Sequence, residues 1–178
     1  MQVNLYLLHA IIVTLAQLLL KIISPNFNDT DVIGLFCRRP QRVCWCPWLP
    51  ERPIKIQGKV ILLQHPGEEK RNLKTGPMLQ HGLEAGSCLI FYGKKFGIDS
   101  NNPGLVELLQ SPGTLLLYPG YQSVPLNDVV SQRKPEDPYN IVILDGTWAQ
   151  AKSLYYHSPM LHSLPQVSSC NFKKGSTV

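Results

Sequence analysis

Three cysteine thiols lie close together in the sequence and could bind a metal ion. Cys37 is followed by Cys44 and Cys46, whereas Cys88 and Cys170 are far from any other cysteine. Thiolates at this spacing repel one another unless a cation holds them, and zinc takes four ligands in tetrahedral positions. An odd number of cysteines, three of them crowded together, is not typical of a secreted disulfide framework, so reduced thiols in an intracellular protein are favoured. Two alternatives stay open, a zinc site and a group of idle thiols.

A second group of polar residues follows short apolar runs of the chain. The segments are Gln64–Glu68, Pro119–Gly120 and Asp145–Trp148. A carboxylate such as Asp145 can serve as a general base when it is placed beside an acidic proton. The structural alternative is that Asp145 or Thr147 caps the helix that is expected to follow.

The apolar runs that precede these segments predict buried strands. The expected strands are Val60–Leu63, Cys88–Tyr92, Thr114–Tyr118 and Ile141–Leu144, and the expected helices include Gly104–Gln110 and Trp148–His157. Strands that alternate with helices and are apolar throughout indicate an α/β domain with a mainly parallel sheet and flanking helices. Ligands of such sheets bind beyond the carboxyl ends of the strands. The three polar segments are therefore expected to form one site.

Length and charge limit the classes of protein that fit. The 178 residues are enough for one domain with a core, and 44% hydrophobic against 16% charged residues favours a folded chain. The net charge is +5, and residues 37–74 contain nine Lys and Arg against three acids. A local excess of six positive charges suits a polyanion such as RNA. A solvated basic face without a partner is the alternative.

The first segment differs from the rest of the chain. Leu5–Leu20 carries no formal charge and is mostly apolar, but it is short for a membrane span of about 20 residues. It has no basic start, as a secretory signal would. A surface-packed helix is expected first, then an interfacial or weak membrane helix, then a signal peptide. We expect residues 1–36 to be this segment and its linker, and residues 37–178 to be the domain, in the cytoplasm or nucleus or both.

Several motifs occur in the order found in one known family. They are Arg39-Pro40, Cys44-Trp45-Cys46-Pro47, His65-Pro66-Gly67-Glu68, Leu116-Leu117-Tyr118-Pro119, Asp145-Gly146-Thr147-Trp148 with Ala149-Gln150-Ala151-Lys152, and Leu164-Pro165. On these motifs the chain resembles the DTW-domain family over residues 37–167. The resemblance implies a fold like that of the SPOUT-type transferases. It also implies transfer of the 3-amino-3-carboxypropyl group of S-adenosylmethionine to N3 of a tRNA uridine, with release of methylthioadenosine.

The resemblance also implies roles for individual residues. Asp145 is the expected catalytic base, and a free aspartate with a pKa of about 3.9 would need an apolar setting to become effective. Tyr118 and Trp148 could supply that setting or stack on a base, with core packing expected for Trp148 more than for Tyr118. Glu68 could hold the amino group of the cofactor, with His65 orienting it. The expected cofactor-binding residues are His65, Glu68, Leu117, Tyr118, Pro119, Gly120, Thr147 and Trp148.

The resemblance also allows the cysteines of this chain to be compared with the family pattern. The family pattern has a further cysteine three positions before Cys37, where this chain has Gly34. The fourth ligand of a zinc ion would then come from His9, His81 or water. The residues expected to contact tRNA are Arg38, Arg39, Arg42 and Lys152.

The match to the family fades after Val167, and other functions stay open. We expect this chain to lack a segment that helps to close the cofactor site, as a splice variant, a gene-model fragment or a divergent member would, and therefore to bind cofactor weakly and turn over little. The alternatives are an inactive chain that binds RNA and a methyltransferase that uses the same cofactor on RNA. No obligate protein partner is expected. A membrane-anchored interaction protein would rest on Leu5–Leu20 alone.

Overall fold

The computed structural model describes residues 34–71, 74–98, 102–134 and 137–168. The predicted N-terminal helix at Leu5–Leu20 lies outside these residues. Within the described part, no helix is both long and apolar enough to cross a membrane.

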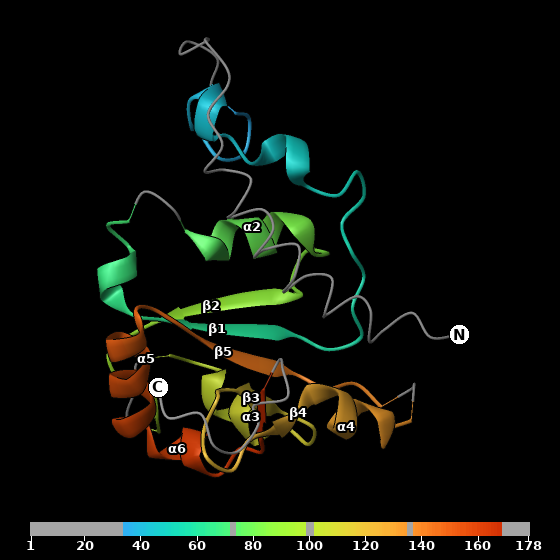
Figure 1. Cartoon of the computed structure of the whole chain (residues 1–178), viewed down its shortest axis with the longest axis vertical. Helices are drawn as coiled ribbons and strands as arrows, with labels where there is room; N and C mark the ends of the chain where they lie inside the picture. Colours follow the sequence, from blue (N-terminus) through green and yellow to red (C-terminus); the bar gives the residue numbers. More distant parts are fainter. Residues whose placement is uncertain (1–33, 72–73, 99–101, 135–136, 169–178) are drawn as a thin grey trace. The chain divides into compact units, whose positions relative to one another are not determined.

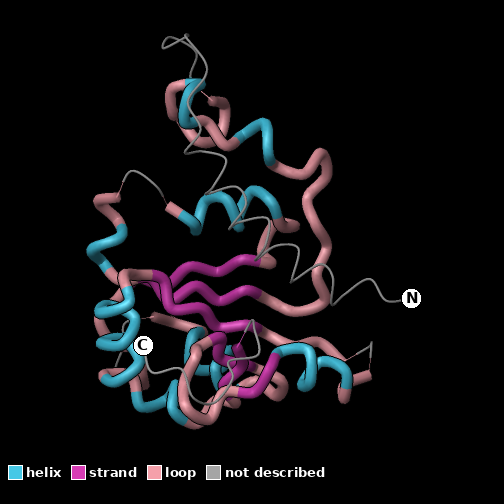
Figure 2. The backbone as a smooth tube through the Cα atoms, in the orientation of Figure 1, coloured by secondary structure: helices cyan, strands magenta, loops and turns pink. Residues whose placement is uncertain are grey.

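The chain divides into two compact units, which are described separately. The first, here called the cysteine unit, comprises the described residues 34–56 together with 75–85. The second, called the sheet unit, comprises residues 57–74 and the described residues from 86 onward. The tube in Figure 2 shows that all the extended strands belong to the sheet unit. The predicted domain boundary after residue 36 stays a prediction, because most residues before it lie outside the described part.

The sheet unit contains six strands that all run in the same direction. Their order across the sheet is β2-β1-β5-β3-β6-β4, and every pair of neighbours is parallel (Figure 1). The strands are β1 (Val60–Gln64), β2 (Cys88–Tyr92), β3 (Leu115–Leu117), β4 (Val124–Pro125), β5 (Ile141–Asp145) and β6 (Gln166–Ser168). The predicted α/β fold with a mainly parallel sheet is confirmed.

The four predicted strands are present with ends that differ by one residue at most. The two additional strands, β4 and β6, have only two and three residues, too few to show a hydrophobic pattern. Pro125 lies in β4, which is an edge strand and therefore tolerates the missing N–H of proline.

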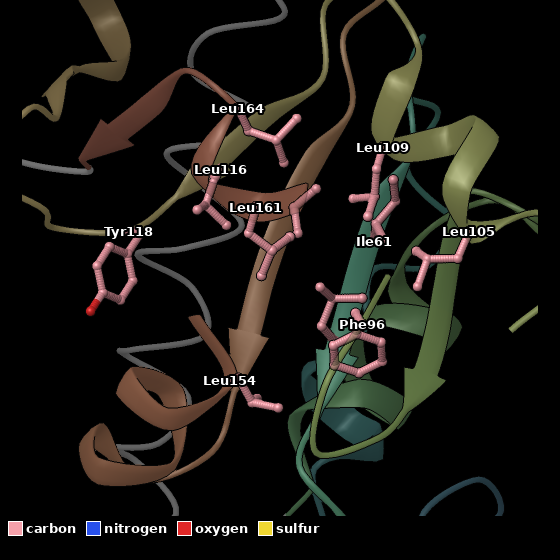
Figure 3. Close-up of a cluster of buried hydrophobic side chains, with 11 residues drawn as sticks. Ile61, Phe96, Leu105, Leu109, Leu116, Tyr118, Leu154, Leu161 and Leu164 are labelled. Carbon is pink, nitrogen blue, oxygen red and sulfur yellow. The ribbon is translucent and has the colours of Figure 1, made fainter. Parts of the chain in front are cut away.

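Helices cover the sheet and bury its apolar strands. The helices of the sheet unit are η3 (Pro66–Glu68), α3 (Leu105–Gln110), α4 (Leu126–Ser131), α5 (Trp148–Tyr156) and α6 (Pro159–His162). Figure 3 shows side chains of the sheet and of α3, α5 and α6 pointing into one core, which includes Ile61, Leu105, Leu116, Leu154 and Leu161. The alternate strand residues are buried as well, Val60 and Leu62 each to 1% exposure. Burial of both faces explains why these strands are apolar throughout.

The cysteine unit has a small core of its own. Its elements are η1 (Gln41–Val43), η2 (Cys46–Trp48) and α2 (Thr75–Gly82). Trp45 is 1% exposed and packs with Met78 of α2, and Cys37 and Cys46 lie against this pair. A bridge between Ile54 and Leu83 joins the two stretches of chain that form the unit.

Candidate functional site

The carboxyl ends of the central strands bring the predicted polar segments together. In the sheet register Gln64, the last residue of β1, lies beside Asp145, the last residue of β5. The N–H of His65 donates to the Asp145 carbonyl over 2.9 Å, so the loops after the two strands start at the same level. In Figure 1, η3 and α5 lie at the same edge of the sheet, on the left of the view.

Asp145 receives a hydrogen bond from Gln64, a residue of the first polar segment to which the sequence assigned no role of its own. Gln64 is 2% exposed, and its Nε2 donates to Oδ2 of Asp145 over 2.5 Å. Burial limits the rotamers of Gln64, so the bond fixes the direction of the half-buried Asp145 carboxylate. The signal in the sequence was a polar residue that ends an apolar strand and directly precedes His65.

The loop after β1 is held by its own hydrogen bonds. The N–H of Gly67 donates to Nδ1 of His65 over 3.1 Å, which leaves Nε2 as the other polar atom of the ring. Glu68 is 6% exposed, and its Oε1 lies 3.1 Å from Nε of Arg71. That ion pair lacks the alignment of a hydrogen bond, so Oε1 is a buried oxygen without a hydrogen-bond donor among the described residues.

Thr147, not Asp145, caps the helix that follows β5. The hydroxyl of Thr147 accepts from the N–H of Gln150 over 3.2 Å, and the Gln150 side chain accepts from the N–H of Thr147 over 2.7 Å. This capping box satisfies the N–H groups of Thr147 and Gln150. The Asp145 side chain is therefore not needed as the helix cap. A Cβ on Gly67 would lie 2.7 Å from Nε2 of Gln150, so Gln150 also packs against the His65–Glu68 loop.

Aromatic rings form a stacked layer beside these loops. Tyr118 is 8% exposed and stacks on Tyr155 at 4.5 Å between ring centroids and on Trp148 at 5.8 Å. The Tyr118 hydroxyl points away from the labelled leucines in Figure 3. Burial raises the pKa of Tyr118, and the nearby Tyr156 and Tyr155 add to the shift. The expectation that Trp148 rather than Tyr118 packs in the core was wrong, because Trp148 begins α5 at the sheet edge and is 53% exposed.

The remaining predicted cofactor residues lie on the loop after β3. Leu117 ends β3 half-buried, Pro119 is exposed and Gly120 is half-buried. A Cβ on Gly120 would overlap Oε1 of Gln166, whose Nε2 donates to the Tyr155 hydroxyl over 2.7 Å. A side chain at position 120 would therefore require the Gln166 side chain to move away from the loop.

The cysteine unit brings its three thiols into one group. The sulfur atoms of Cys37, Cys44 and Cys46 lie within 4.8 Å of one another. A zinc ion with bonds of about 2.3 Å holds tetrahedral sulfur ligands about 3.8 Å apart, so this geometry fits. A Cβ on Gly34 would overlap the Cys44 sulfur and lie 2.7 Å from that of Cys37. Position 34 therefore faces the group directly, and a cysteine there could join it only if the three thiols moved apart.

Of the two histidines proposed as the fourth ligand, only His81 lies in the described part, and there it is not among the grouped ligand atoms. Its ring packs at a tilt against Phe36 at 5.0 Å and against Trp45 at 6.0 Å. His9 lies outside the described part. Burial raises the pKa of Cys44 to about 11, whereas for Cys37 burial is outweighed by hydrogen bonds from the Arg39 backbone and the other thiols, which lower its pKa.

The predicted RNA-contacting residues fall in both units. Arg38 is exposed with a φ of 51°, Arg39 is half-buried, and the side chain of Arg42 lies outside the described part. Lys152 is exposed on α5, with its Nζ 5.3 Å from the centroid of the Trp148 ring.

Comparisons with known proteins identify the family. A sequence profile of the DTW domain matches residues 35–174, and the chain belongs to this family. Over 131 residues, 74% of this chain, it is 50% identical to a Drosophila melanogaster protein named tRNA-uridine aminocarboxypropyltransferase 2, of which it covers 51%. Relatives of the same name from Macaca fascicularis and Mus musculus are 37% identical over the same share of this chain, with 43% of each covered.

The chain spans about half the length, or less, of the curated relatives it matches. No solved structure matches this chain significantly.

Proposed function

We propose that this chain transfers the 3-amino-3-carboxypropyl group of S-adenosylmethionine to N3 of a uridine in tRNA. The names of its relatives support the reaction class and the RNA. The observation that carries the proposal is the pairing of Gln64 with Asp145 at the sheet edge, because it fixes a carboxylate where the loops of three strands meet.

In this proposal Asp145 is the general base. The proton on N3 of uridine passes to the Asp145 carboxylate, and the N3 electron pair forms the new bond to the carboxypropyl carbon. The bond between that carbon and the sulfonium sulfur breaks, and its electron pair leaves the neutral thioether of methylthioadenosine. Gln64 keeps the accepting oxygen in place, so the chain contributes orientation as well as basicity.

The loops around Asp145 suit a co-substrate with a cationic amino-acid part and an aromatic base. Glu68 offers a buried carboxylate whose Oε1 is ion-paired with Arg71 but accepts no hydrogen bond from the described residues, and this carboxylate suits the ammonium group. Gly67, Gly120 and Gly146 keep the loops free of side chains near the edge. The Tyr118 and Trp148 rings are proposed to contact the adenine, and His65, Leu117, Pro119 and Thr147 are proposed to shape the same pocket.

The cysteine unit is proposed to bind zinc and to contact tRNA. Cys37, Cys44 and Cys46 would be the protein ligands, with the fourth position open beside Gly34. A bound ion would order the loop that carries Arg38, Arg39 and Arg42, whose charges suit tRNA phosphates. An intracellular site of action, in the cytoplasm or nucleus, is proposed on the free thiols of the described cysteines.

The test is direct product analysis. The 178-residue chain is incubated with tRNA and with S-adenosylmethionine labelled in the carboxypropyl group, and the tRNA is then digested to nucleosides. We expect labelled 3-(3-amino-3-carboxypropyl)uridine and an equal amount of methylthioadenosine, formed more slowly than with the Drosophila relative as positive control. S-adenosylhomocysteine in place of methylthioadenosine would instead establish methyl transfer. Binding of tRNA without any transfer, when the control is active, would leave an RNA-binding function.

A further inference from the structure

Two exposed aromatic rings and a lysine lie along one face of α5. Trp148, Lys152 and Tyr156 are four residues apart, so they fall on one side of the helix. The exposed fraction is 53% for Trp148 and 69% for Tyr156, and Lys152 is exposed between them. We call these three residues the α5 stripe.

Buried Tyr118 and half-buried Tyr155 contact the exposed rings of the α5 stripe. Trp148 stacks on Tyr118 with an angle of 17° between the ring planes, and Tyr118 stacks on Tyr155 at 13°. Tyr155 in turn meets Tyr156 edge to face at 5.9 Å. A ligand that stacks on such supported rings loses little affinity to side-chain ordering. Single exposed aromatic residues are ordinary on protein surfaces, whereas Trp148 and Tyr156 are linked through the stacked rings of Tyr118 and Tyr155.

The α5 stripe carries one positive charge, Lys152, that can contact a phosphate. The sequence contains no aspartate or glutamate after Asp145, whereas this part of the chain includes Lys152. The Lys152 ammonium lies over the Trp148 ring, which is also stacked on Tyr118, and from there it can contact a phosphate. Tyr156 lies about 12 Å from Trp148 along the helix axis, so its ring would hold a nucleotide beyond the adenine contact that is proposed for Trp148.

The chemistry of the proposed substrate explains why unpaired nucleotides would be present here. N3 of uridine lies on the Watson–Crick edge, so a uridine in a base pair cannot react there. The reacting uridine must therefore come from a single-stranded part of the RNA, whose bases are free to stack on aromatic side chains. α5 starts three residues after Asp145, so the α5 stripe runs away from the proposed reaction centre.

We propose that the α5 stripe is a stacking platform for the unpaired nucleotides that flank the modified uridine. This inference rests on the proposed function for the identity of the RNA, but its test requires neither cofactor nor turnover. The platform binds through ring faces and one phosphate contact, so it recognises single strands with little preference for their sequence.

The test measures binding of a fluorescent eight-nucleotide oligouridine and of a blunt RNA duplex of equal length. Tyr156→Leu should weaken oligouridine binding about 5- to 30-fold and leave duplex binding unchanged, because one stacked base is lost. Tyr156→Phe keeps the ring and should bind within about twofold of the parent. Lys152→Ala should weaken binding and flatten its salt dependence more than the control Lys59→Ala, which removes an exposed lysine just before β1, at the opposite edge of the sheet.

The outcomes separate this inference from the proposed function. Equal oligouridine binding by Tyr156→Leu and the parent, or an equal loss for the duplex, would overturn the platform. So would a change of oligomeric state in Tyr156→Leu without a change in RNA binding, since a second copy of the chain would then be the occupant. Loss of stacking in a chain that forms no aminocarboxypropyl product would retain the platform and reject the proposed reaction. Normal product formation with an unchanged KM for tRNA in Tyr156→Leu would reject the platform and retain the proposed reaction.

Discussion

Replacing Gln64 by methionine should slow catalysis without unfolding the protein. Methionine has nearly the shape of glutamine and suits a side chain that is 2% exposed, but it cannot donate to Oδ2 of Asp145. A hydrogen bond to a charged group contributes about 1.5–3 kcal/mol. If this energy holds the carboxylate in its reactive orientation, its loss lowers kcat about 10- to 150-fold.

The assay is steady-state formation of the modified uridine, with kcat and KM for tRNA measured separately. We expect kcat to fall and KM for tRNA to change less than about threefold, because Gln64 is buried and does not reach the RNA. The matched control is Asn140→Leu. Asn140 also has an amide side chain that bridges strands, since it accepts from the N–H of Lys59 and donates to Thr114, but it precedes β5 at the opposite edge of the sheet. This control should lower the melting temperature and leave kcat of the folded protein unchanged.

A glutamate at position 64 gives a second readout. Gln64→Glu places two carboxyl groups within hydrogen-bond distance, and like charges this close favour a single shared proton. The pH profile of kcat should therefore shift toward higher pH, where the shared proton is lost. A parental kcat in Gln64→Met, or a parental pH profile in Gln64→Glu, would refute a positioning role for Gln64.

Three further predictions concern the other proposed sites. Gly34→Cys should raise bound zinc, measured by elemental analysis, from less than one to one per chain, and a tightly held stoichiometric zinc in the parent would contradict the missing ligand. Replacing Arg38, Arg39 and Arg42 together by alanine should lower the slope of log affinity against log salt for tRNA by about 2, and an unchanged slope would make them a solvated face. Asp145→Asn should lower the rate about 10²- to 10⁴-fold with little change in S-adenosylmethionine binding measured by calorimetry. Loss of S-adenosylmethionine binding together with activity would assign Asp145 to cofactor binding instead.

The strands that form the sheet could be predicted because burial on both faces leaves a continuous apolar run. The apolar run covers the first four residues of β1 and of β5 and all five residues of β2. β4 and β6 could not be predicted, because a strand of two or three residues is defined by its neighbours rather than by its own side chains. α2 also gave no sequence signal, since its Gly76, Pro77 and Gly82 are typical of turns.

The loops of the candidate site could be predicted as a group, but not their internal contacts. Parallel strands place their carboxyl ends at one edge, so the grouping of His65 and Asp145 follows from topology. The bond from Gln64 to Asp145 depends on the register of β1 against β5, which no local pattern specifies. The exposure of Trp148 likewise depends on where α5 leaves the sheet, because an aromatic side chain suits a core and a surface equally well.

The path of the chain between β1 and β2 makes the stability of one unit depend on the other. The chain leaves the sheet unit after Lys74, supplies α2 to the cysteine unit and returns at Gly86. β2 is an edge strand whose sole neighbour in the sheet is β1, and 23 residues, His65 to Ser87, separate the two. Closing a flexible loop of that length costs about 3 kcal/mol, and an anchored α2 removes much of this cost. Melting of the cysteine unit would therefore appear first as faster amide hydrogen exchange in β2, while β5 and β3 stay protected.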